Sequence, residues 1–570
     1  MRFTRFKRQS LTLHITVTLF LCGIFPASAF PALPGPADAG RINPQQEAVP
    51  PPPQKNEGTV VPESTAPLVQ APPGAEKIKL VLKEVDFEGV TAFKPEELRD
   101  IYTPYIGQKV TMDIAWMMAG QLTERYRKEG YFLSQAYVPE QHIKGGKITI
   151  SVIEGYIGQI DLDDKTVADH FVVKALINRM LSRKPVKSND VESFLLRMND
   201  LPGLTFRAVL SPLTGAEKKE GAIKLTLLPG KKENADSLSV DNFGSRFLGP
   251  QEATLDYQMS LLPLQQSEIT LLSAYPLNNL YSASLKHTLP LFTDASLTLT
   301  GSTTNAYPGY TLTPLKVGSV SNFAGFTINY QPLRQRLDNL SLRIGFDGRD
   351  TNANTFAGPL TREHIRALRL GANYTGIADK LGGQSSIDAS LSQGTRLLGA
   401  SNENDPDLSR AHAVPDFTKL DMTLSRLQSI TRNWYAVSTL TGQTTHDILY
   451  SSEEFGYGGQ ALGRAYDSSE IIGDKGAAGS VELRYNGFYS VQPLAITPYT
   501  FYDIGKVWSN SPNTHPMSGS SAGLGFRFTA PTRIEGITTL AFPLTKPEAN
   551  PIYGGSGTGP RILFQILKRF

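Results

Sequence analysis

The sequence predicts a mainly β protein in which two small α+β domains precede a transmembrane antiparallel β-barrel of about 16 strands. From residue 231 to residue 570, short alternating segments are punctuated by Gly, Pro, Asn and Asp. A membrane strand of about 9–11 residues and its turn use roughly 20 residues, and this spacing gives the strand count. The last segment places Ile562, Phe564, Ile566 and Phe570 on one strand face. A final strand that ends on an aromatic residue is typical of outer-membrane barrels, for which it is the assembly signal.

The composition is compatible with a barrel and not with a helical membrane protein. Mean hydropathy is −0.21, and beyond the N-terminal stretch no apolar run approaches the ~20 residues of a spanning helix. Membrane strands escape such a search because only alternate residues face lipid. The formal charge of +3 and the absence of a basic tract give no indication of nucleic-acid binding. A soluble array of β-sandwiches or a propeller is the alternative interpretation.

Residues 1–29 are predicted to be a secretory signal peptide. Four basic residues precede an apolar stretch at 11–25, and Ala-Ser-Ala at 27–29 is a small-residue cleavage site. The single cysteine, Cys22, lies in this stretch. Lipidation there is the competing prediction, but Leu21 occupies the position where a lipobox requires a small residue. Cleavage would leave a chain without cysteine, which excludes disulfides and thiol chemistry.

Two consecutive segments, 77–155 and 156–230, share one order of predicted elements, β-α-α-β-β. In the first, a strand around Val85 is followed by helices at 94–105 and 112–128 and by strands at 131–138 and 147–153. In the second, a strand at 157–162 is followed by helices at 167–181 and 189–199 and by strands at 205–210 and 222–228. Two units of about 75 residues with the same order indicate an internal duplication.

The alternation in the third region also predicts which side chains face the barrel lumen. Residues 253–259, 340–346 and 481–486 alternate apolar and other residues. In the strand near residue 500, Leu494, Ile496, Tyr502 and Ile504 form the apolar face, so Phe501, Asp503 and Gly505 are expected to point inward. A lipid-facing aspartate would be costly, whereas a lumenal one is tolerated. Gly505 would allow a loop backbone to approach the wall closely.

Several motifs, in the same order along the chain, resemble those of the TpsB transporters of two-partner secretion, the haemolysin secretion/activation family. The resemblance covers residues 77–570. Residues 126–131 (YRKEGY), 136–141 (AYVPEQ) and 146–155 (GKITISVIEG) are similar to the first POTRA domain of the family, and 198–203 (MNDLPG) to a turn of the second. Residues 240–246 (VDNFGSR) resemble the beginning of its first barrel strand, 459–466 (GQALGRAY) with 473–476 (GDKG) its conserved loop, and 501–505 (FYDIG) its Phe-x-Asp-x-Gly strand motif.

The resemblance implies a loop that folds back into the barrel and is locked there. It implies an Arg464–Asp503 ion pair, which an arginine suits because it can contact a carboxylate with two prongs. The other residues implied in the lock are Tyr466, Phe501 and Gly505, and those of the loop motif are Gly463, Gly473 and Asp474. Ala465 stands where the family usually has glycine, so a positive backbone φ at this position would be disfavoured.

Residues 30–76 are predicted to be a proline-rich linker that cannot bury enough apolar surface to fold by itself. Family members often carry an N-terminal helix that plugs the barrel, and residues 37–46 resemble a remnant of it. Pro44 falls where that helix should continue, and the prolines at 50–53 would end any helix soon after.

No catalytic, cofactor or metal site is predicted. Residues 519–523 fit the Gly-x-Ser-x-Gly pattern of hydrolases, but they run directly into an alternating strand, whereas a nucleophile elbow requires a following helix. The eight histidines are scattered, and no glycine-rich phosphate loop precedes a lysine.

The function that the resemblance implies is transport of a large secreted TpsA-type exoprotein across the bacterial outer membrane, with the POTRA domains in the periplasm and without nucleotide hydrolysis. The exoprotein is expected to add an extended segment to a POTRA sheet edge, with 147–153 and 222–228 as the candidate strands. Other expected partners are outer-membrane lipid and, during biogenesis, the barrel-assembly machinery and periplasmic chaperones. A barrel-assembly factor is the main alternative, although that branch typically has three to five POTRA domains. A diffusion porin or receptor and a surface enzyme are the remaining ones.

Overall fold

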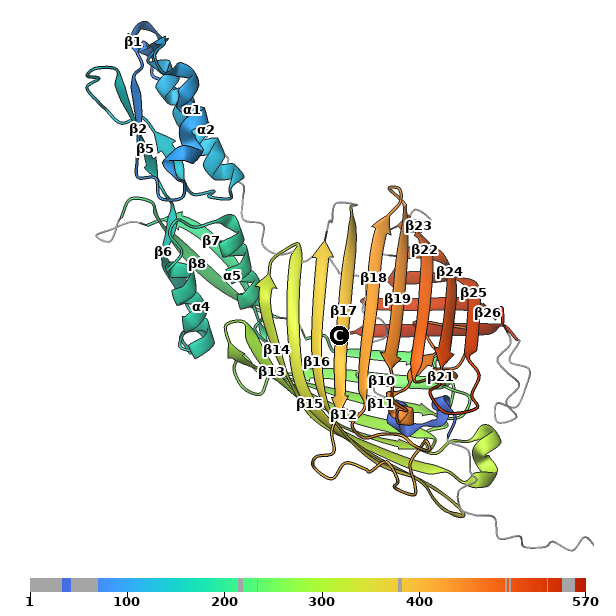
Figure 1. Ribbon diagram of the computed structural model, residues 1–570. Helices are drawn as coiled ribbons and strands as arrows, with labels where there is room; N and C mark the ends of the chain where they lie inside the picture. The colour runs from blue at the N-terminus through green and yellow to red at the C-terminus, as the bar shows by residue number, and fades with distance from the viewer. Residues whose placement is uncertain are drawn as a thin grey trace, which may run out of the picture. The chain divides into compact units, whose positions relative to one another are not determined.

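The computed structural model describes residues 33–42, 70–213, 219–232, 234–377, 382–486, 489–491, 494–530, 532–545 and 559–570. The predicted signal peptide and most of the predicted linker lie outside these residues. Figure 1 shows two small α+β domains and a β-barrel, which confirms the predicted fold class.

The first small domain packs helices on a three-stranded sheet of order β2-β5-β4. Its strands are β2 (Glu84–Glu88), β4 (Gln135–Tyr137) and β5 (Lys147–Ile153), and β1 (Lys79–Val81) pairs with β3 (Lys109–Thr111). Its helical elements are η3 (Ala75–Lys77), η4 (Pro95–Leu98), α1 (Arg99–Tyr102), η5 (Thr103–Tyr105) and α2 (Asp113–Lys128). The core includes Leu98, Met118, Leu122, Tyr126 and Ile148. The helical turns predicted at 94–105 are present but do not form one α-helix: η4, α1 and η5 follow one another, and Pro95 and Pro104, which have no N–H to donate, stand at the first turns of η4 and η5.

The second small domain repeats the arrangement, with sheet order β6-β8-β7. Its elements are β6 (Tyr156–Leu162), α3 (Lys165–Ala168), α4 (Phe171–Leu181), α5 (Ser188–Asp200), β7 (Leu204–Pro212) and β8 (Ala222–Lys231). The predicted helix 167–181 is divided, because His170 has extended backbone angles and its side chain caps α4 at Val172 N. Val173, Leu176, Phe194 and Leu225 are among the core residues.

Both strands that were predicted to accept an extended segment are central strands. In each domain the last strand pairs in parallel with the first strand and antiparallel with its own predecessor. β5 and β8 therefore have no free edge, and their prediction as docking edges is wrong. The outer strands are β2 and β4 in the first domain and β6 and β7 in the second.

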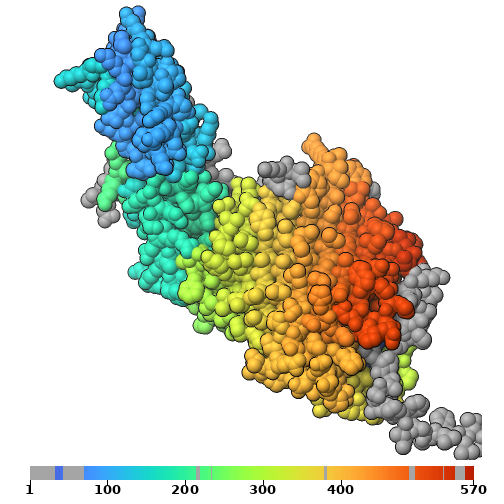
Figure 2. Space-filling model, viewed as in Figure 1, coloured from blue at the N-terminus to red at the C-terminus, as the bar shows by residue number. Residues whose placement is uncertain are grey.

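The third part is a closed antiparallel barrel in which the first strand, β9, pairs with the last, β27. β22 and β23 both pair with β24 and form one wall strand, so the barrel has 16 strands, as predicted. The wall consists of β9 (Ser237–Asp241), β10 (Gln251–Met259), β11 (Gln266–Tyr275), β12 (Leu280–Phe292), β13 (Ala295–Ala306), β14 (Gly318–Arg334), β15 (Asp338–Thr355), β16 (Gly358–Ile377), β17 (Gly383–Gly394), β18 (Thr418–Ser429), β19 (Trp434–Thr445), β22 (Lys475–Tyr485), β23 (Tyr489–Val491), β24 (Leu494–Trp508), β25 (Met517–Ala530), β26 (Ile534–Pro543) and β27 (Arg561–Arg569). On the face shown in Figure 2, the strands coloured from yellow-green to red form a continuous surface.

The wall is apolar outside and polar inside, as the alternation predicts. Leu342, Ile344, Val481, Tyr502 and Ile504 are exposed on the outer face. On the lumen side, Asp503 is 0% exposed and Glu482 is 4% exposed. The Gly-x-Ser-x-Gly stretch lies within the uninterrupted strand β25, so no nucleophile elbow is present there. None of the described helices is long and apolar enough to cross a membrane.

The two ends of the barrel differ in their connections. β9 begins shortly after β8, and at this end β12 and β13, β18 and β19, and β25 and β26 are joined by short turns. At the other end, long connections join β17 to β18, β19 to β22 and β24 to β25. We call these the short-turn end and the long-loop end.

Candidate functional site

The connection between β19 and β22, residues 446–474, folds into the barrel, and we call it the inner loop. It contains η7 (Ser451–Glu453) and a small hairpin of β20 (Phe455–Tyr457) with β21 (Ile471–Gly473). Most of its buried apolar residues form one cluster with wall residues such as Phe501, Val507 and Ala541; from the loop this cluster contains Phe455, Tyr457, Leu462, Ala465, Tyr466 and Ile471. The loop is thus packed against the wall as a core is packed within a domain.

The tip of the inner loop places Arg464 against two wall strands, β22 and β24. Its guanidinium Nη2 lies 3.2 Å from Asp503 Oδ1, and Nη1 lies 2.9 Å from Glu482 Oε2. Nη2 also donates to Ser480 Oγ at 2.9 Å. The guanidinium carbon lies 3.8 Å from the centre of the Phe501 ring. Arg464 is 7% exposed, so its charge is balanced almost entirely by these groups.

Asp503, on the wall strand β24, also binds the backbone of the tip. Its Oδ2 accepts hydrogen bonds from the backbone N–H groups of Gly463 and Arg464 at 3.2 and 3.1 Å, and from Ser521 Oγ. Ser480 Oγ donates to Oδ1 at 2.7 Å. A carboxylate that accepts from both the backbone and the side chain of one loop fixes the position and the direction of that loop.

Glu482 is a wall residue that contacts the tip and that was not predicted as a site residue from the sequence. It lies on the same inward face of β22 as Ser480, and it pairs with Arg464, Arg484 and Arg527. The signal was available, because Val481 and Leu483 face outward in the same alternation and leave Glu482 in the lumen.

The other predicted site residues lie around this tip. Tyr466 is 1% exposed and its hydroxyl donates to the carbonyl oxygens of Ser520 and Thr545. The group that approaches Gly505 is a ring rather than the predicted loop backbone: a Cβ there would lie 2.2 Å from Cδ2 of Tyr457. Gly463 has a φ of +77°, whereas the φ of Ala465 is not positive. Ala465 therefore has no strain from a positive φ.

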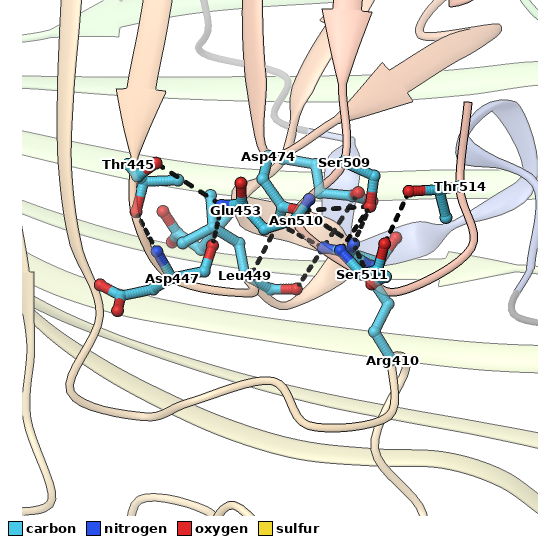
Figure 3. Close-up of polar contacts among 12 residues, drawn as sticks. Arg410, Thr445, Asp447, Leu449, Glu453, Asp474, Ser509, Asn510, Ser511 and Thr514 are labelled. Atoms are coloured by element: carbon cyan, nitrogen blue, oxygen red, sulfur yellow. Dashed lines mark hydrogen bonds and ion pairs between the residues drawn. The ribbon is translucent and has the colours of Figure 1, made fainter. Parts of the chain in front are cut away.

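Asp474 and Gly473 lie at the base of the inner loop rather than at its tip. Figure 3 shows the carboxylate of Asp474 facing Arg410, which comes from the loop 395–417. Arg410 Nη1 and Nη2 contact Asp474 Oδ1 and Oδ2 at 2.5 and 2.9 Å. The backbone N–H groups of Leu449 and Asn510 donate to the same carboxylate at 2.7 and 2.6 Å. Asp474 thus joins both limbs of the inner loop to the loop 395–417 and to the connection after β24.

Residues 33–42 lie within the barrel as two turns, η1 (Gly35–Ala37) and η2 (Ala39–Arg41), beside β21 in Figure 1. Ser451 Oγ donates to Asp38 Oδ2 at 2.7 Å, and the Arg41 guanidinium donates to the carbonyl oxygens of Ser451 and Glu454. Arg349 Nη1 donates to the carbonyl oxygen of Gly40 at 2.7 Å. This is a contact with the inner loop, although no α-helix forms in the described part; Pro44 lies outside it.

At the opposite end of the chain, Phe570 is 61% exposed and its N–H donates to the carbonyl oxygen of Asp236. Its strand has Ile562 and Ile566 exposed on the outer face. Among the described residues, no three His, Cys, Asp or Glu side chains are placed to hold a metal ion.

Comparisons with known proteins agree with this architecture. The family model of the haemolysin secretion/activation protein ShlB/FhaC/HecB matches residues 222–526, and the ShlB-type POTRA domain model matches residues 80–155. The heme/hemopexin transporter protein HuxB of Haemophilus influenzae is 24% identical over 427 residues, which are 73% of this chain and 74% of HuxB. The outer membrane transporter CdiB of Dickeya dadantii is 21% identical, over 92% of this chain and 94% of CdiB.

A solved structure has the same fold over most of its length. CdiB from Escherichia coli superposes with a TM-score of 0.70 at 19% identity, covering 89% of this chain and 94% of that one. Because the family model spans more than half of the sequence, the chain belongs to the ShlB/FhaC/HecB family of haemolysin secretion/activation proteins.

Proposed function

We propose that this protein is a dedicated transporter of two-partner secretion, which recognises one large TpsA-type exoprotein and moves it through the outer membrane. The observation that carries the proposal is a 16-stranded barrel whose lumen holds the inner loop and residues 33–42, joined to two α+β domains. Relatives named as heme/hemopexin, CdiB and hemolysin transporters support it. The protein lies in the bacterial outer membrane with its POTRA domains in the periplasm. We assign residues 1–29 to the signal peptide, 30–76 to the linker, 77–155 and 156–230 to the POTRA domains and 231–570 to the barrel.

The exoprotein would arrive unfolded and add a strand to an outer edge of a POTRA sheet. β7 is the favoured edge, because its nine residues make it the longest of the four outer strands, before β6 with seven, β2 with five and β4 with three, and a longer edge offers more backbone hydrogen bonds. Val209 on β7 and Leu228 on β8 are 49% and 44% exposed. They supply apolar contacts beside the backbone ladder.

Passage through the barrel would require the inner loop and residues 33–42 to leave their places in the lumen. The lock is Arg464 with Asp503, supported by Glu482, Phe501, Tyr466 and Gly505. The sequence has no nucleotide-binding loop, so folding of the exoprotein outside the cell would drive export. We propose no catalytic role, and we expect lipid, periplasmic chaperones and the assembly machinery that reads the strand ending at Phe570 as the other partners.

The test is secretion from a strain that lacks this gene. We expect one large exoprotein to disappear from the culture medium while other outer-membrane barrels remain at normal levels, and complementation with the wild-type gene should restore it. A general fall in outer-membrane proteins without the loss of one exoprotein would contradict the proposal and favour a barrel-assembly factor.

A further inference from the structure

Asp467, one residue after Tyr466, is an inner-loop carboxylate that contacts two arginines outside the loop. Its Oδ2 lies 2.5 Å from Arg246 Nε, and its Oδ1 lies 3.2 Å from Arg561 Nη2. The Asp467 side chain is 4% exposed. One buried carboxylate therefore holds two cations, one with each oxygen.

The two arginines belong to the two sides of the barrel closure. Arg246 lies in the connection between β9 and β10, and Arg561 is the first residue of β27. β9 and β27 are the first and last strands, and their pairing closes the barrel. We call this pairing the seam. Asp467 thus reaches across the seam from the lumen at the long-loop end.

The seam is weakly paired at this end. Its ladder has five residue pairs, from Gln565–Asp241 to Arg569–Ser237, whereas β24 and β25 share thirteen. Beyond Asp241, Asn242 continues the contact: its N–H donates to the carbonyl oxygen of Phe564, and its side chain bonds Phe564 N and the carbonyl oxygen of Ile562. Side chains therefore replace a regular ladder where Asp467 bridges the strands.

The bridge depends on the position of the inner loop, because its carboxylates belong to that loop and its arginines belong to the seam. Glu470, also on the inner loop, lies 3.3 Å from Arg246 Nη2. If the loop left the lumen, both carboxylates would leave with it, and the seam arginines would lose these partners together. The Arg246 and Arg561 side chains are 27% and 21% exposed, so each would stay partly desolvated after losing the Asp467 carboxylate.

We propose that Asp467 couples the inner loop to the seam, so that the loop in its closed position clamps the first and last strands together and its withdrawal loosens their long-loop end. The proposal rests on the inner loop being the part that moves during transport. It implies that the pairing of β9 with β27 weakens at the long-loop end when the pore opens.

Hydrogen exchange of the full-length protein in lipid tests the clamp. In Asp467→Asn, amides of 237–241 and 561–567 should exchange at least tenfold faster than in the wild type, while those of β14 and β15 stay unchanged. Asp416→Asn is the matched control, because Asp416 forms an exposed pair with Arg396. Unchanged exchange at the seam in a folded Asp467→Asn barrel, judged by its heat-dependent gel mobility, would overturn the proposal.

A seam disulfide tests the coupling in the other direction. Asp241 and Gln565 are the direct partners nearest the long-loop end of the seam ladder, a placement compatible with a disulfide, and the natural sequence has only Cys22. The oxidised Asp241→Cys/Gln565→Cys protein should open less often in planar bilayers, and reduction should restore opening. Equal opening in both states would overturn the coupling. Neither measurement uses the exoprotein, so a failure of the proposed transport function would be seen separately, as normal secretion in the deletion strain.

Discussion

The tip and the base of the inner loop are both held by a buried arginine–carboxylate contact, but the charges are carried by different parts. At the tip, the loop carries the cation, Arg464, and rigid wall strands carry Asp503 and Glu482. At the base, Asp474 carries the anion at the end of the inner loop, and Arg410 belongs to another loop. The tip contact can therefore be broken by movement of one loop against a fixed wall.

The base has the properties of a hinge rather than of a moving contact. Asp474 accepts from backbone N–H groups of Leu449 and Asn510, which belong to the first limb of the inner loop and to the connection after β24. The carbonyl oxygen of Asp474 accepts from Gln443 Nε2 of β19 at 2.9 Å. Breaking these contacts would separate the inner loop, the loop 395–417 and the connection after β24 from one another. The comparison suggests that the tip moves during transport and that the base stays closed.

The largest effect is expected at the base, from Asp474→Ala. The change leaves two backbone N–H groups without an acceptor and Arg410 with Glu454, 3.1 Å from its Nη1, as its remaining carboxylate, so we expect a cost at or below the about 3–5 kcal/mol of a fully broken buried pair. We expect less folded barrel in the membrane and a lower midpoint in chemical unfolding. Asp416→Ala, in an exposed pair, should cost less than about 1 kcal/mol. If both variants unfolded at the same denaturant concentration as the wild type, the base would not be the hinge.

Arg464→Lys, at the tip, should affect folding less and transport more than Asp474→Ala. Lysine keeps the charge but cannot reach Asp503 and Glu482 with a planar fork. The barrel should fold normally, its resting conductance in planar bilayers should rise, and secretion should fall at least tenfold. A double-mutant cycle with Glu482→Gln measures how much of the lock depends on Glu482. Wild-type conductance and secretion would show that the tip is not a lock.

The space beneath Tyr457 can be tested with Gly505→Ala. The new Cβ would lie 2.2 Å from the ring, and overpacking of this kind costs about 1–3 kcal/mol. The hairpin β20–β21 should shift from the wall, and secretion should decrease. Gly301→Ala is the matched control, because its nearest neighbour would be a backbone oxygen at 3.9 Å. Tyr457→Ala should rescue Gly505→Ala, and failure of that rescue would mean that the ring is not the obstacle.

At the tip the sequence indicated both Arg464 and Asp503, whereas at the base it indicated Asp474 but not its partner Arg410, for a physical reason. Asp503 lies on a strand whose outward neighbours, Tyr502 and Ile504, reveal its direction, because side chains alternate. Glu482 carries the same signal. Arg410 lies in a loop with no periodicity, so the sequence alone gives no direction for its side chain. The order of the strands within each small sheet could not be predicted either. The period of two indicates which residues share a face of a strand, but it does not indicate that β5 and β8 pair between two earlier strands.

The smallest effect is expected from Ala465→Gly, which restores the residue common in the family. The φ of Ala465 is not positive, so the substitution relieves no strain; it adds freedom to the unfolded chain, at about 0.4–1 kcal/mol, and removes one methyl group from the buried cluster. Secretion should stay at the wild-type level. Gly463→Ala, two residues earlier, should be worse, since its φ is +77° and the added Cβ would meet the Tyr457 ring at 2.8 Å. If Ala465→Gly instead raised secretion strongly, the tip would adopt a second conformation that needs a positive φ at this residue, and the lock would be a mobile one.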